Sequence, residues 1–325
     1  MRCVTRVDGR IDVHQHAITP AIARLLREAN APFVLPWSLT ETWDVFEANG
    51  IARGMLSNPI PGGFFTGAAQ AADLVSTADE SIAALRDEHP DEFGFLAALP
   101  MPYVDESLAQ LDYAYDVLGA DGVVLIPQSG GDYLGCERYL PLFEELNRRS
   151  AVVLVHPMML PGGQVTAPPV VLADFLLDTT RAAVNLMLTR TLDRFPRIRW
   201  ILAHAGGFLP YAASRVRLLG ARFFGVDAAT FDDYLGRFWY DTALSAPSAL
   251  PSLVAGVGVT QVLFGTDWSA APAGVVSSCT QALDAELTDE ARELVNRGNA
   301  LRLFDRAGAP VVTGAPGPHP ASSTS

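Results

Sequence analysis

The stretch Ile11-Asp12-Val13-His14-Gln15-His16, close to the start of the chain, decides the fold and the chemistry that we expect. It has the length and composition of a short β-strand, in which successive side chains point to opposite faces. His14 and His16 therefore share one face and are close enough to bind a single metal ion. Two structural histidines with ordinary hydrogen-bond partners would give the same pattern, so the rest of the chain has to decide.

Seven more short apolar runs follow, which makes eight expected strands. They span Arg10–His16, Gly54–Asn58, Gly94–Leu99, Gly122–Pro127, Val152–Pro157, Arg199–His204, Phe238–Ala243 and Gln261–Asp267. Several of them, such as Val152-Val153-Leu154-Val155, are apolar almost throughout. That composition is typical of strands that are buried on both faces of a parallel sheet.

Segments with helical periodicity lie between these runs. They include Pro20–Glu28, Ala68–Glu88, Glu106–Leu118, Pro141–Arg149, Asp174–Phe195, Phe208–Leu219, Pro247–Gly256 and Asp289–Phe304. Alternating strands and helices predict a parallel α/β fold, and eight units favour one closed (β/α)8 TIM-type barrel. A doubly wound open sheet is the alternative.

We expect the barrel to form a single domain over residues 1–306. Elongated loops rich in Pro and Gly follow two of the strands, at Pro59–Gly67 and Met158–Pro169, where a barrel has its active-site face. Residues 307–325 consist mostly of Gly, Pro, Ser, Thr and Ala, so we expect a flexible, disordered tail there.

The 325 residues carry a formal charge of −13, and all 23 basic residues are arginine. A chain without lysine has no Walker-type phosphate loop, no Schiff-base chemistry and no metal pair bridged by a carbamylated lysine. The acidic field makes nucleic acid and anionic membranes poor partners.

The scattered Cys3, Cys136 and Cys279 indicate neither disulfides nor a thiolate zinc site. Because no apolar run approaches the roughly 20 residues of a membrane span, we expect a cytoplasmic protein.

Further groups that bind metals or move protons stand where other expected strands end. His156 lies at the end of the fifth strand, His204 at the end of the sixth and Asp267 at the end of the eighth. Each alone has an ordinary explanation, as a core histidine or a helix-capping aspartate. Together they bring four of the six histidines and a carboxylate to one end of the barrel. Burying so many polar groups requires a cation or a hydrogen-bond network, so we expect a functional site there.

The chain resembles the amidohydrolase superfamily, and within it the branch of the aminocarboxymuconate-semialdehyde, γ-resorcylate and 6-methylsalicylate decarboxylases. The motifs that carry this resemblance are Asp12-Val13-His14-Gln15-His16, Asp121-Gly122-Val123, Tyr133-Leu134-Gly135, Glu145-Leu146-Asn147-Arg148-Arg149, His156-Pro157, Phe195-Pro196, His204-Ala205-Gly206-Gly207, Gly265-Thr266-Asp267 and Gly298-Asn299-Ala300-Leu301-Arg302-Leu303-Phe304. They cover nearly all of Arg10–Phe304 and exclude the tail. The resemblance implies a carboxy-lyase that forms a homodimer.

The resemblance also implies the members of the site. The ligands of one divalent ion would be His14, His16, His156 and Asp267, and His204 would be an unligated acid–base group beside them. Two-metal relatives add a lysine from the fourth strand, where this chain has Val123-Val124-Leu125-Ile126, so a mononuclear site is expected. Three imidazoles and one carboxylate suit Zn2+, and Mn2+ remains possible with the same ligands.

Two more aspartates lie near these residues in the expected barrel. Asp12 shares the inward phase of His14 and lies one layer deeper, so we expect it to form hydrogen bonds inside the barrel or to orient a ligand. Asp241 stands at the end of the seventh strand, where it either orients His204 or lines the pocket.

The expected reaction is the non-oxidative decarboxylation of a small aromatic acid of the salicylate type. Protonation of the ring carbon before CO2 leaves avoids an aryl carbanion, and the proton comes from Asp267 or from a water relayed by His204. A hydrolase of a lactone or amide would use the same ion to activate water. A barrel kept only as a binding scaffold would have damaged ligands, and none of the five site residues is damaged.

Aromatic residues in the loops are candidates to flank a flat substrate ring. Phe64, Phe65 and Trp268 suit such a ring, and they could equally pack the loops against the rim of the barrel. Relatives of the aminocarboxymuconate type hold a second carboxylate with an early arginine. The segment Trp37–Asp44 here lacks arginine, which favours a monocarboxylate such as a salicylate.

Overall fold

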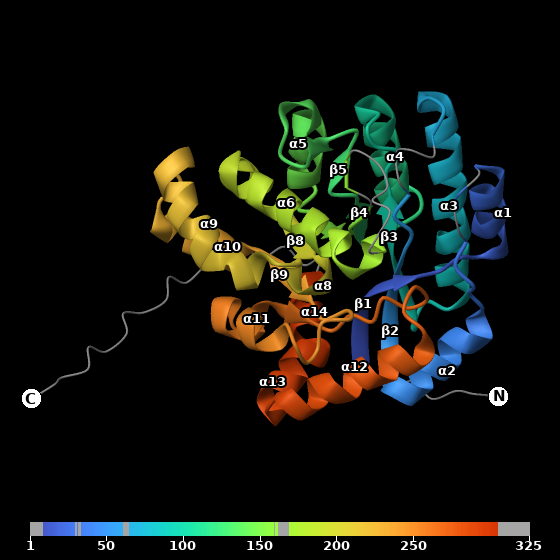
Figure 1. The fold of residues 1–325 in the computed structure, drawn as a ribbon. Coiled ribbons are helices and arrows are strands. Elements are labelled where there is room, and N and C mark those ends of the chain that lie inside the picture. The colour runs from blue at the N-terminus through green and yellow to red at the C-terminus, as the bar shows by residue number, and fades with distance from the viewer. Residues whose placement is uncertain are drawn as a thin grey trace, which may run out of the picture.

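The computed structural model describes residues 9–29, 31, 34–60, 65–158, 160–161 and 169–304. Within them, eight parallel strands pair in the order β1-β2-β3-β4-β7-β8-β9-β10 and curl into a nearly closed barrel (Figure 1). The strands are β1 Arg10–His16, β2 Ile51–Ser57, β3 Phe93–Ala98, β4 Gly122–Leu125, β7 Val152–Val155, β8 Arg199–Leu202, β9 Trp239–Asp241 and β10 Val262–Leu263. The expected (β/α)8 architecture is confirmed, and the open sheet is excluded.

Backbone hydrogen bonds between β1 and the segment that follows β10 bring the barrel close to closure. The amide of Val13 donates to the carbonyl of Phe264 at 3.0 Å, and the amide of Asp267 donates to the carbonyl of His14 at 2.8 Å. Gln15 and Trp268 form an isolated parallel bridge just beyond. The seam therefore runs directly beside the residues expected to bind a metal.

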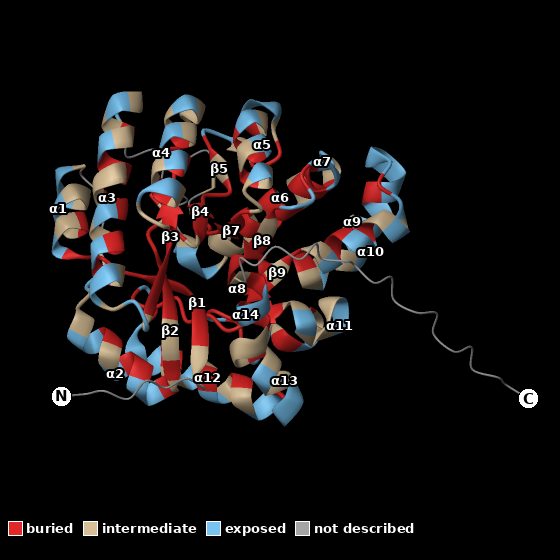
Figure 2. Cartoon of the chain, turned by 180° about the vertical axis from the view of Figure 1, so that it is seen from behind, coloured by how far each residue is buried: buried red, intermediate tan, exposed pale blue. Residues whose placement is uncertain are grey.

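Helices form the outer layer of the barrel. They are α1 Pro20–Glu28, α2 Leu39–Asn49, α3 Ala68–Glu88, α4 Val104–Asp116, α5 Leu140–Arg148, α6 Asp174–Leu188, α7 Thr191–Arg194, α9 Leu209–Phe224, α10 Ala228–Arg237, α11 Leu250–Val257, α12 Ala273–Glu286, α13 Asp289–Glu293 and α14 Asn299–Phe304. The short segment α8 Ala203–Gly206 is instead a buried turn at the end of β8. Figure 2 shows buried residues along the strands and exposed residues on the outer sides of the helices. Apolar side chains from both layers make one continuous core.

The described residues also contain a short hairpin, three 3-10 turns and a π-helical turn. A two-stranded hairpin, β5 Gln128–Ser129 and β6 Asp132–Tyr133, follows β4, and short 3-10 turns span Glu137–Tyr139, Val170–Leu172 and Val259–Gln261. A π-helical turn at Leu294–Gly298 joins α13 to α14. None of the helices in the described residues has the length and apolarity needed to cross a bilayer.

Several local predictions were wrong. Asp174–Phe195 is two helices, because Arg190 adopts a φ of 54°, which a right-handed helix cannot continue. The helix α2 was not expected, although Ser38 caps its start by accepting from the amide of Glu41 at 3.2 Å, and Gly50 ends it with a φ of 64°. Helices α10 and α12 were also missed.

Strands β4 and β7 end earlier than expected, at Leu125 and Val155. His156 consequently lies just past its strand, while its amide still donates to the carbonyl of Leu125 at 2.9 Å. The two elongated loops lie partly outside the described residues, and the tail at 307–325 lies wholly outside them. The domain boundary at residue 306 therefore stays a prediction.

Candidate metal centre

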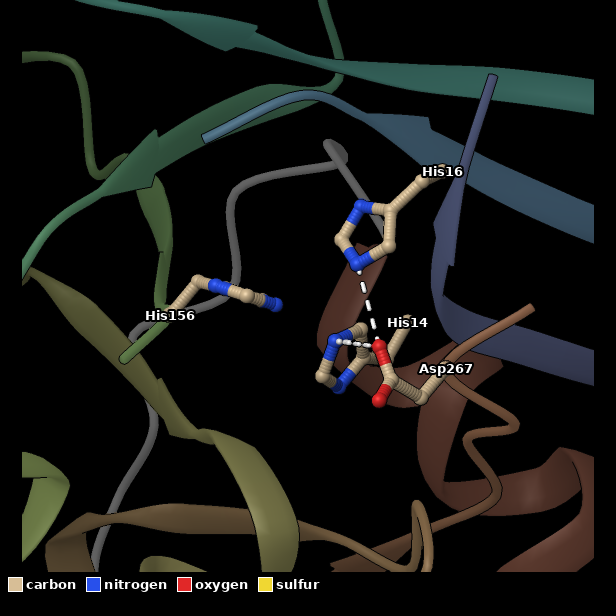
Figure 3. A group of neighbouring side chains, drawn as sticks. All are labelled: His14, His16, His156 and Asp267. Atoms are coloured by element: carbon tan, nitrogen blue, oxygen red, sulfur yellow. Dashed lines mark hydrogen bonds and ion pairs between the residues drawn. The ribbon is translucent and has the colours of Figure 1, made fainter. Parts of the chain in front are cut away.

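Four side chains from three separate parts of the chain meet at the carboxyl end of the barrel. His14 and His16 come from β1, His156 follows β7, and Asp267 follows β10 (Figure 3). All four are buried, and one ligand atom from each lies within 4.8 Å of the others. Nitrogen and carboxylate oxygen donors in this number and spacing could hold one divalent metal ion.

Hydrogen bonds to the far side of each β1 imidazole orient the ring. Nδ1 of His14 donates to Oδ2 of Asp241 at 2.8 Å, and Nδ1 of His16 donates to the carbonyl of Ser57 at 3.0 Å. Each Nε2 therefore faces Asp267, whose Oδ1 lies 3.3 Å from Nε2 of His14 and 3.1 Å from Nε2 of His16. To bind a metal ion, each imidazole would keep its proton on Nδ1 and present the unprotonated Nε2 to the ion in place of the contact with Asp267.

The surroundings of His156 test whether these residues fit a metal ion. Its ring lies 4.8 Å from the ring of His16 and 4.9 Å from that of His14, measured between centroids. Both ring nitrogens are buried, and neither has a hydrogen-bond partner among the described residues. Burial and the neighbouring histidines hold the pKa of His156 well below its usual value. A buried neutral imidazole without a partner is costly unless a ligand accepts its lone pair, so a metal ion fits.

The pKa values of the charged groups in the pocket also favour a bound cation. Burial would raise the pKa of Asp267, but hydrogen bonds from His14 and His16 hold it well below its usual value. Burial opposes a charge on His14 as well, yet the carboxylates of Asp241 and Asp267 raise its pKa to about 10. The pocket therefore stabilises positive charge beside an ionised Asp267, and a divalent cation is such a charge.

His204 lies beside the four residues without belonging to their group. Its backbone is left-handed, with a φ of 54° and a ψ of 55°, where the chain turns sharply after β8. Nδ1 donates to the carbonyl of Ala243 at 3.1 Å, which leaves Nε2 without that proton. The ring centroid is 5.1 Å from that of His14 and 6.1 Å from that of His156. The position suits an acid–base group next to a metal, as the sequence predicts.

Asp241 connects two of these residues from the end of β9. Its Oδ2 accepts from the ring of His14, and its Oδ1 accepts from the backbone amides of His204 at 2.8 Å and Ala243 at 3.0 Å. The carboxylate thus holds the backbone of His204; the sequence predicts that Asp241 either orients that residue or lines the pocket. The contact with His14 was missed, because no local signal pairs positions so far apart in the sequence.

Asp12 ties the first strand to the segment that carries Asp267. It accepts from the amide of His14 at 3.1 Å, from the amide of Thr266 at 3.1 Å and from the hydroxyl of Thr266 at 2.6 Å. Full burial raises its pKa to about 7, against the lowering effect of these hydrogen bonds. Asp267 follows directly with a φ of 61°. Asp12 is the hydrogen bonder inside the barrel that the sequence predicts, and it holds the backbone on both sides of the seam.

Gly265 leaves space for the contact between the side chains of His14 and Asp241. A Cβ built on Gly265 would lie 3.1 Å from Cβ of His14 and 3.1 Å from Cβ of Asp241. The absence of a side chain at this position is what lets the aspartate reach the imidazole across the barrel interior. In the sequence Gly265 is only part of the motif Gly265-Thr266-Asp267, because its contacts depend on closure of the barrel.

The candidate substrate-binding residues make packing contacts. The indole N–H of Trp268 donates to the hydroxyl of Thr42 on α2 at 3.0 Å, and the side chain is almost fully buried. Phe65 is half-buried, with its ring centroid 6.4 Å from that of Tyr103. Phe64 lies outside the described residues. A role for these aromatic rings against a substrate stays a prediction.

Comparison with known proteins identifies the class to which this fold and site belong. The amidohydrolase family model Amidohydro_2 matches residues 11–306, and the chain belongs to this family. It is an enzyme of the amidohydrolase superfamily. Similar proteins in this family are decarboxylases, which fits carboxy-lyase activity. The expected family is confirmed.

One relative and two solved structures show the nearer similarities. The chain is 34% identical over 313 residues to the 6-methylsalicylic acid decarboxylase of Penicillium expansum, covering 92% of this chain and 97% of that protein. The crystal structure of an amidohydrolase II superposes with a TM-score of 0.83 at 28% identity, over 91% of this chain and 99% of that one. A dihydroxybenzoic acid decarboxylase from Polaromonas, with bound manganese and 2-nitroresorcinol, has the same fold at a TM-score of 0.78 and 21% identity, over 93% and 98% of the two chains.

Proposed function

We propose that this protein is a divalent-metal-dependent, non-oxidative decarboxylase of a small aromatic acid of the salicylate type. The observation that carries the proposal is the buried group of His14, His16, His156 and Asp267, with ligand atoms within 4.8 Å of one another. Similarity to a 6-methylsalicylic acid decarboxylase along almost the whole of both chains supports the choice of reaction and substrate.

These four side chains would hold one divalent ion, and His204 would stay unligated beside them. We propose Zn2+ on the basis of the three imidazoles, with Mn2+ as the second candidate because a protein of the same fold contains it. When bound, the ion supplies the positive charge that binds the substrate carboxylate and a neighbouring oxygen. The chain carries a net charge of −13, so such local charge matters for an anionic substrate.

Protonation of the ring carbon requires a donor inside this buried site. Asp267 is one candidate because of its place in the site, although its ionised carboxylate would first have to take up a proton. A water relayed by His204 is the other, because Nδ1 of that ring is engaged by Ala243 and Nε2 remains available for proton transfer. The left-handed backbone of His204 holds the ring at this position, and Asp241 holds the backbone.

The remaining parts of the proposal follow from the resemblance and the composition. We propose that Phe64, Phe65 and Trp268 flank the aromatic ring of the bound substrate. We also propose a cytoplasmic location and a homodimer. The lack of an arginine in Trp37–Asp44 supports a substrate with one carboxylate.

The test is a panel of hydroxybenzoates given to the metal-loaded enzyme, with CO2 release and the decarboxylated product measured together. We expect at least one ortho-hydroxybenzoate to lose CO2, and chelation of the metal to stop the reaction. A hydrolase would add water to a lactone or amide and leave a new acid. Turnover of only such compounds would replace the decarboxylase proposal.

A further inference from the structure

We propose that Asp178 on α6 is a positioning residue for the metal ligand His156, which it holds through the backbone amide of Met158. The inference rests on the proposed function only in requiring that the site binds a divalent ion. It assigns a share of the affinity for that ion to a side chain that lies outside the four ligands.

The ring of His156 is held differently from the two other imidazoles of the centre. His14 donates its Nδ1 proton to Asp241, and His16 donates its own to the carbonyl of Ser57. Contacts of this kind orient most imidazoles that bind metals. Both ring nitrogens of His156 are buried, and neither has a hydrogen-bond partner among the described residues. The orientation of His156 therefore has to come from its backbone.

The backbone around His156 is anchored on both sides. Before the ring, the amide of His156 donates to the carbonyl of Leu125 on β4 at 2.9 Å. After it, Pro157 has no amide proton, so the first amide that can be held is that of Met158. This amide donates to Oδ2 of Asp178 at 3.2 Å. Because proline has a fixed φ and restricts the residue before it, a displacement of Met158 is passed on to His156.

Asp178 is itself fixed within the fold. It is fully buried, and its Oδ1 accepts from the hydroxyl of Tyr133 on β6 at 3.0 Å. Burying a carboxylate is costly unless donors face its oxygens, and here each oxygen has one donor. Burial nevertheless raises the pKa of Asp178 to about 6. The side chain connects α6, the hairpin and the segment that follows β7, and Met158 is the point where this segment is attached.

The same helix supports the turn that carries His204. The hydroxyl oxygen of Thr180 on α6 accepts from the amide of Phe208 at 2.8 Å. His156 and His204 are thus placed against one common helix, and their ring centroids are 6.1 Å apart. The contact at Thr180 is separate from the contact at Asp178. Loss of the Asp178 side chain should therefore disturb His156 and leave the turn at His204 in place.

A negative charge near the centre could also attract a cation without any contact to the backbone. The two explanations differ in what an uncharged acceptor does at this position. Asparagine keeps an oxygen that accepts from the amide of Met158, and its NH2 group can donate to the phenol oxygen of Tyr133. Asp178→Asn should therefore keep the affinity for metal if Asp178 acts by position, and lower it if Asp178 acts by charge.

The experiment measures the binding of Zn2+ and of Mn2+ to the metal-free, full-length chain by isothermal titration. We expect Asp178→Ala to weaken binding about 10-fold to 100-fold, the range for groups that orient a metal ligand, and Asp178→Asn to bind like the wild type. His156→Ala retains three ligands, so its weaker binding can still be titrated. Adding Asp178→Ala to His156→Ala should cost almost nothing further, because the ligand that Asp178 positions is already absent. The absorption spectrum of Asp178→Ala loaded with Co2+ should likewise approach that of His156→Ala.

Asn185→Ala is the matched control on the same helix. Nδ2 of Asn185 donates to the carbonyl of Leu134 at 2.9 Å, just after the hairpin rather than in the segment that follows β7. This variant should bind metal like the wild type. Circular dichroism melting curves show whether each variant is folded. If Asp178→Ala is not, Asp178→Leu takes its place, since leucine fills the volume of the aspartate without accepting a hydrogen bond.

Three outcomes would overturn the inference and leave the proposed function intact. The first is wild-type affinity in the folded alanine or leucine variant. The second is an equal loss in Asp178→Ala and Asp178→Asn, because the charge would then be the cause. The third is an additive loss in the double variant with His156→Ala, which would show that Asp178 acts on the site by another route. A wild type that binds no divalent ion would overturn the inference and the proposed function together.

Discussion

The carboxylate of Asp241 accepts a hydrogen bond from the ring of His14: its Oδ2 lies 2.8 Å from Nδ1 of His14, and both side chains are fully buried. The two residues are 227 positions apart and meet across the inside of the barrel. This contact selects the ring nitrogen of His14 that faces Asp267. A carboxylate behind a metal-binding imidazole orients the ring and increases its basicity, so Asp241 belongs to the proposed metal site.

Asp241→Asn should weaken metal binding by about 10-fold to 100-fold, because the amide cannot serve both His14 and the backbone amides of His204 and Ala243. Isothermal titration of the metal-free protein with Zn2+ and with Mn2+ measures the effect. Asp79→Asn, at a buried aspartate on α3 that contacts no member of the site, is the control and should bind metal normally. Unchanged affinity in Asp241→Asn would contradict this assignment.

Metal analysis of the purified protein should return about one divalent ion per chain, as three imidazoles and one carboxylate around a single position require. His14→Ala or His156→Ala should lose most of it. His89→Ala should retain the ion, because His89 packs against the ring of Trp43 and not in the site. Two tightly bound ions per chain would exclude the mononuclear centre.

His204→Asn should keep the metal and lose activity. The asparagine amide can still donate to the carbonyl of Ala243, but no group replaces Nε2. We expect the rate of CO2 release at saturating substrate to fall by about 10²-fold to 10⁴-fold, the range for removal of a general acid–base group. The metal content is measured on the same sample. Parallel loss of the metal would show that His204 is a ligand, contrary to the role proposed here.

Gly265→Ala should destabilise the protein by about 1–3 kcal/mol, the typical cost of overpacking a core. The new methyl group would press on Cβ of both His14 and Asp241, so the affinity for metal should also fall. Gly236→Ala on α10 is the matched control, since a Cβ there meets no atom within 4 Å. Urea unfolding should show the control to be as stable as the wild type or more stable, because alanine favours a helix. Equal effects of the two substitutions would refute the close approach at Gly265.

The buried Asp79 should make stability depend on pH. Burial raises its pKa to about 8, although it accepts hydrogen bonds from the amide of Ala98 at 2.9 Å and the side chain of Gln110 at 2.7 Å. Between its ordinary pKa and this raised value the folded state keeps a proton that the unfolded state has released. The contribution of Asp79 to stability therefore falls as pH rises through this range, with a limiting slope of about 1.4 kcal/mol per pH unit.

Asp79→Asn removes this contribution, and the amide of Gln110 can rotate to accept from the new side chain. The unfolding free energy of the variant, measured in urea from pH 4 to pH 8, should decline less with pH than that of the wild type, and the difference should be greatest at the alkaline end. Parallel curves for the two proteins would show that Asp79 does not titrate in this range.

The sequence determined the main architecture and the four residues that meet in the candidate metal site. Apolar runs and helical periodicity are local properties, so the eight strand–helix units could be counted without a structure. In a parallel barrel the carboxyl ends of the strands meet at one face, which is why His14, His16, His156 and Asp267 could be grouped from their places at strand ends. Two local features were not predicted. A positive φ at Arg190 breaks the expected helix, and Ser38 caps the start of α2, a helix that was not expected.

Only the tertiary structure decided which groups orient that site and which surface is left uncovered. Asp241 reaches His14, and Asp12 reaches Thr266, because closure of the barrel brings together strands that are more than 200 residues apart in the chain. The exposure of Tyr211 and Leu218 likewise depends on which face of α9 the rest of the fold covers. Contacts between distant segments depend on how the whole chain packs, whereas the pattern of a strand or a helix is contained in its own residues.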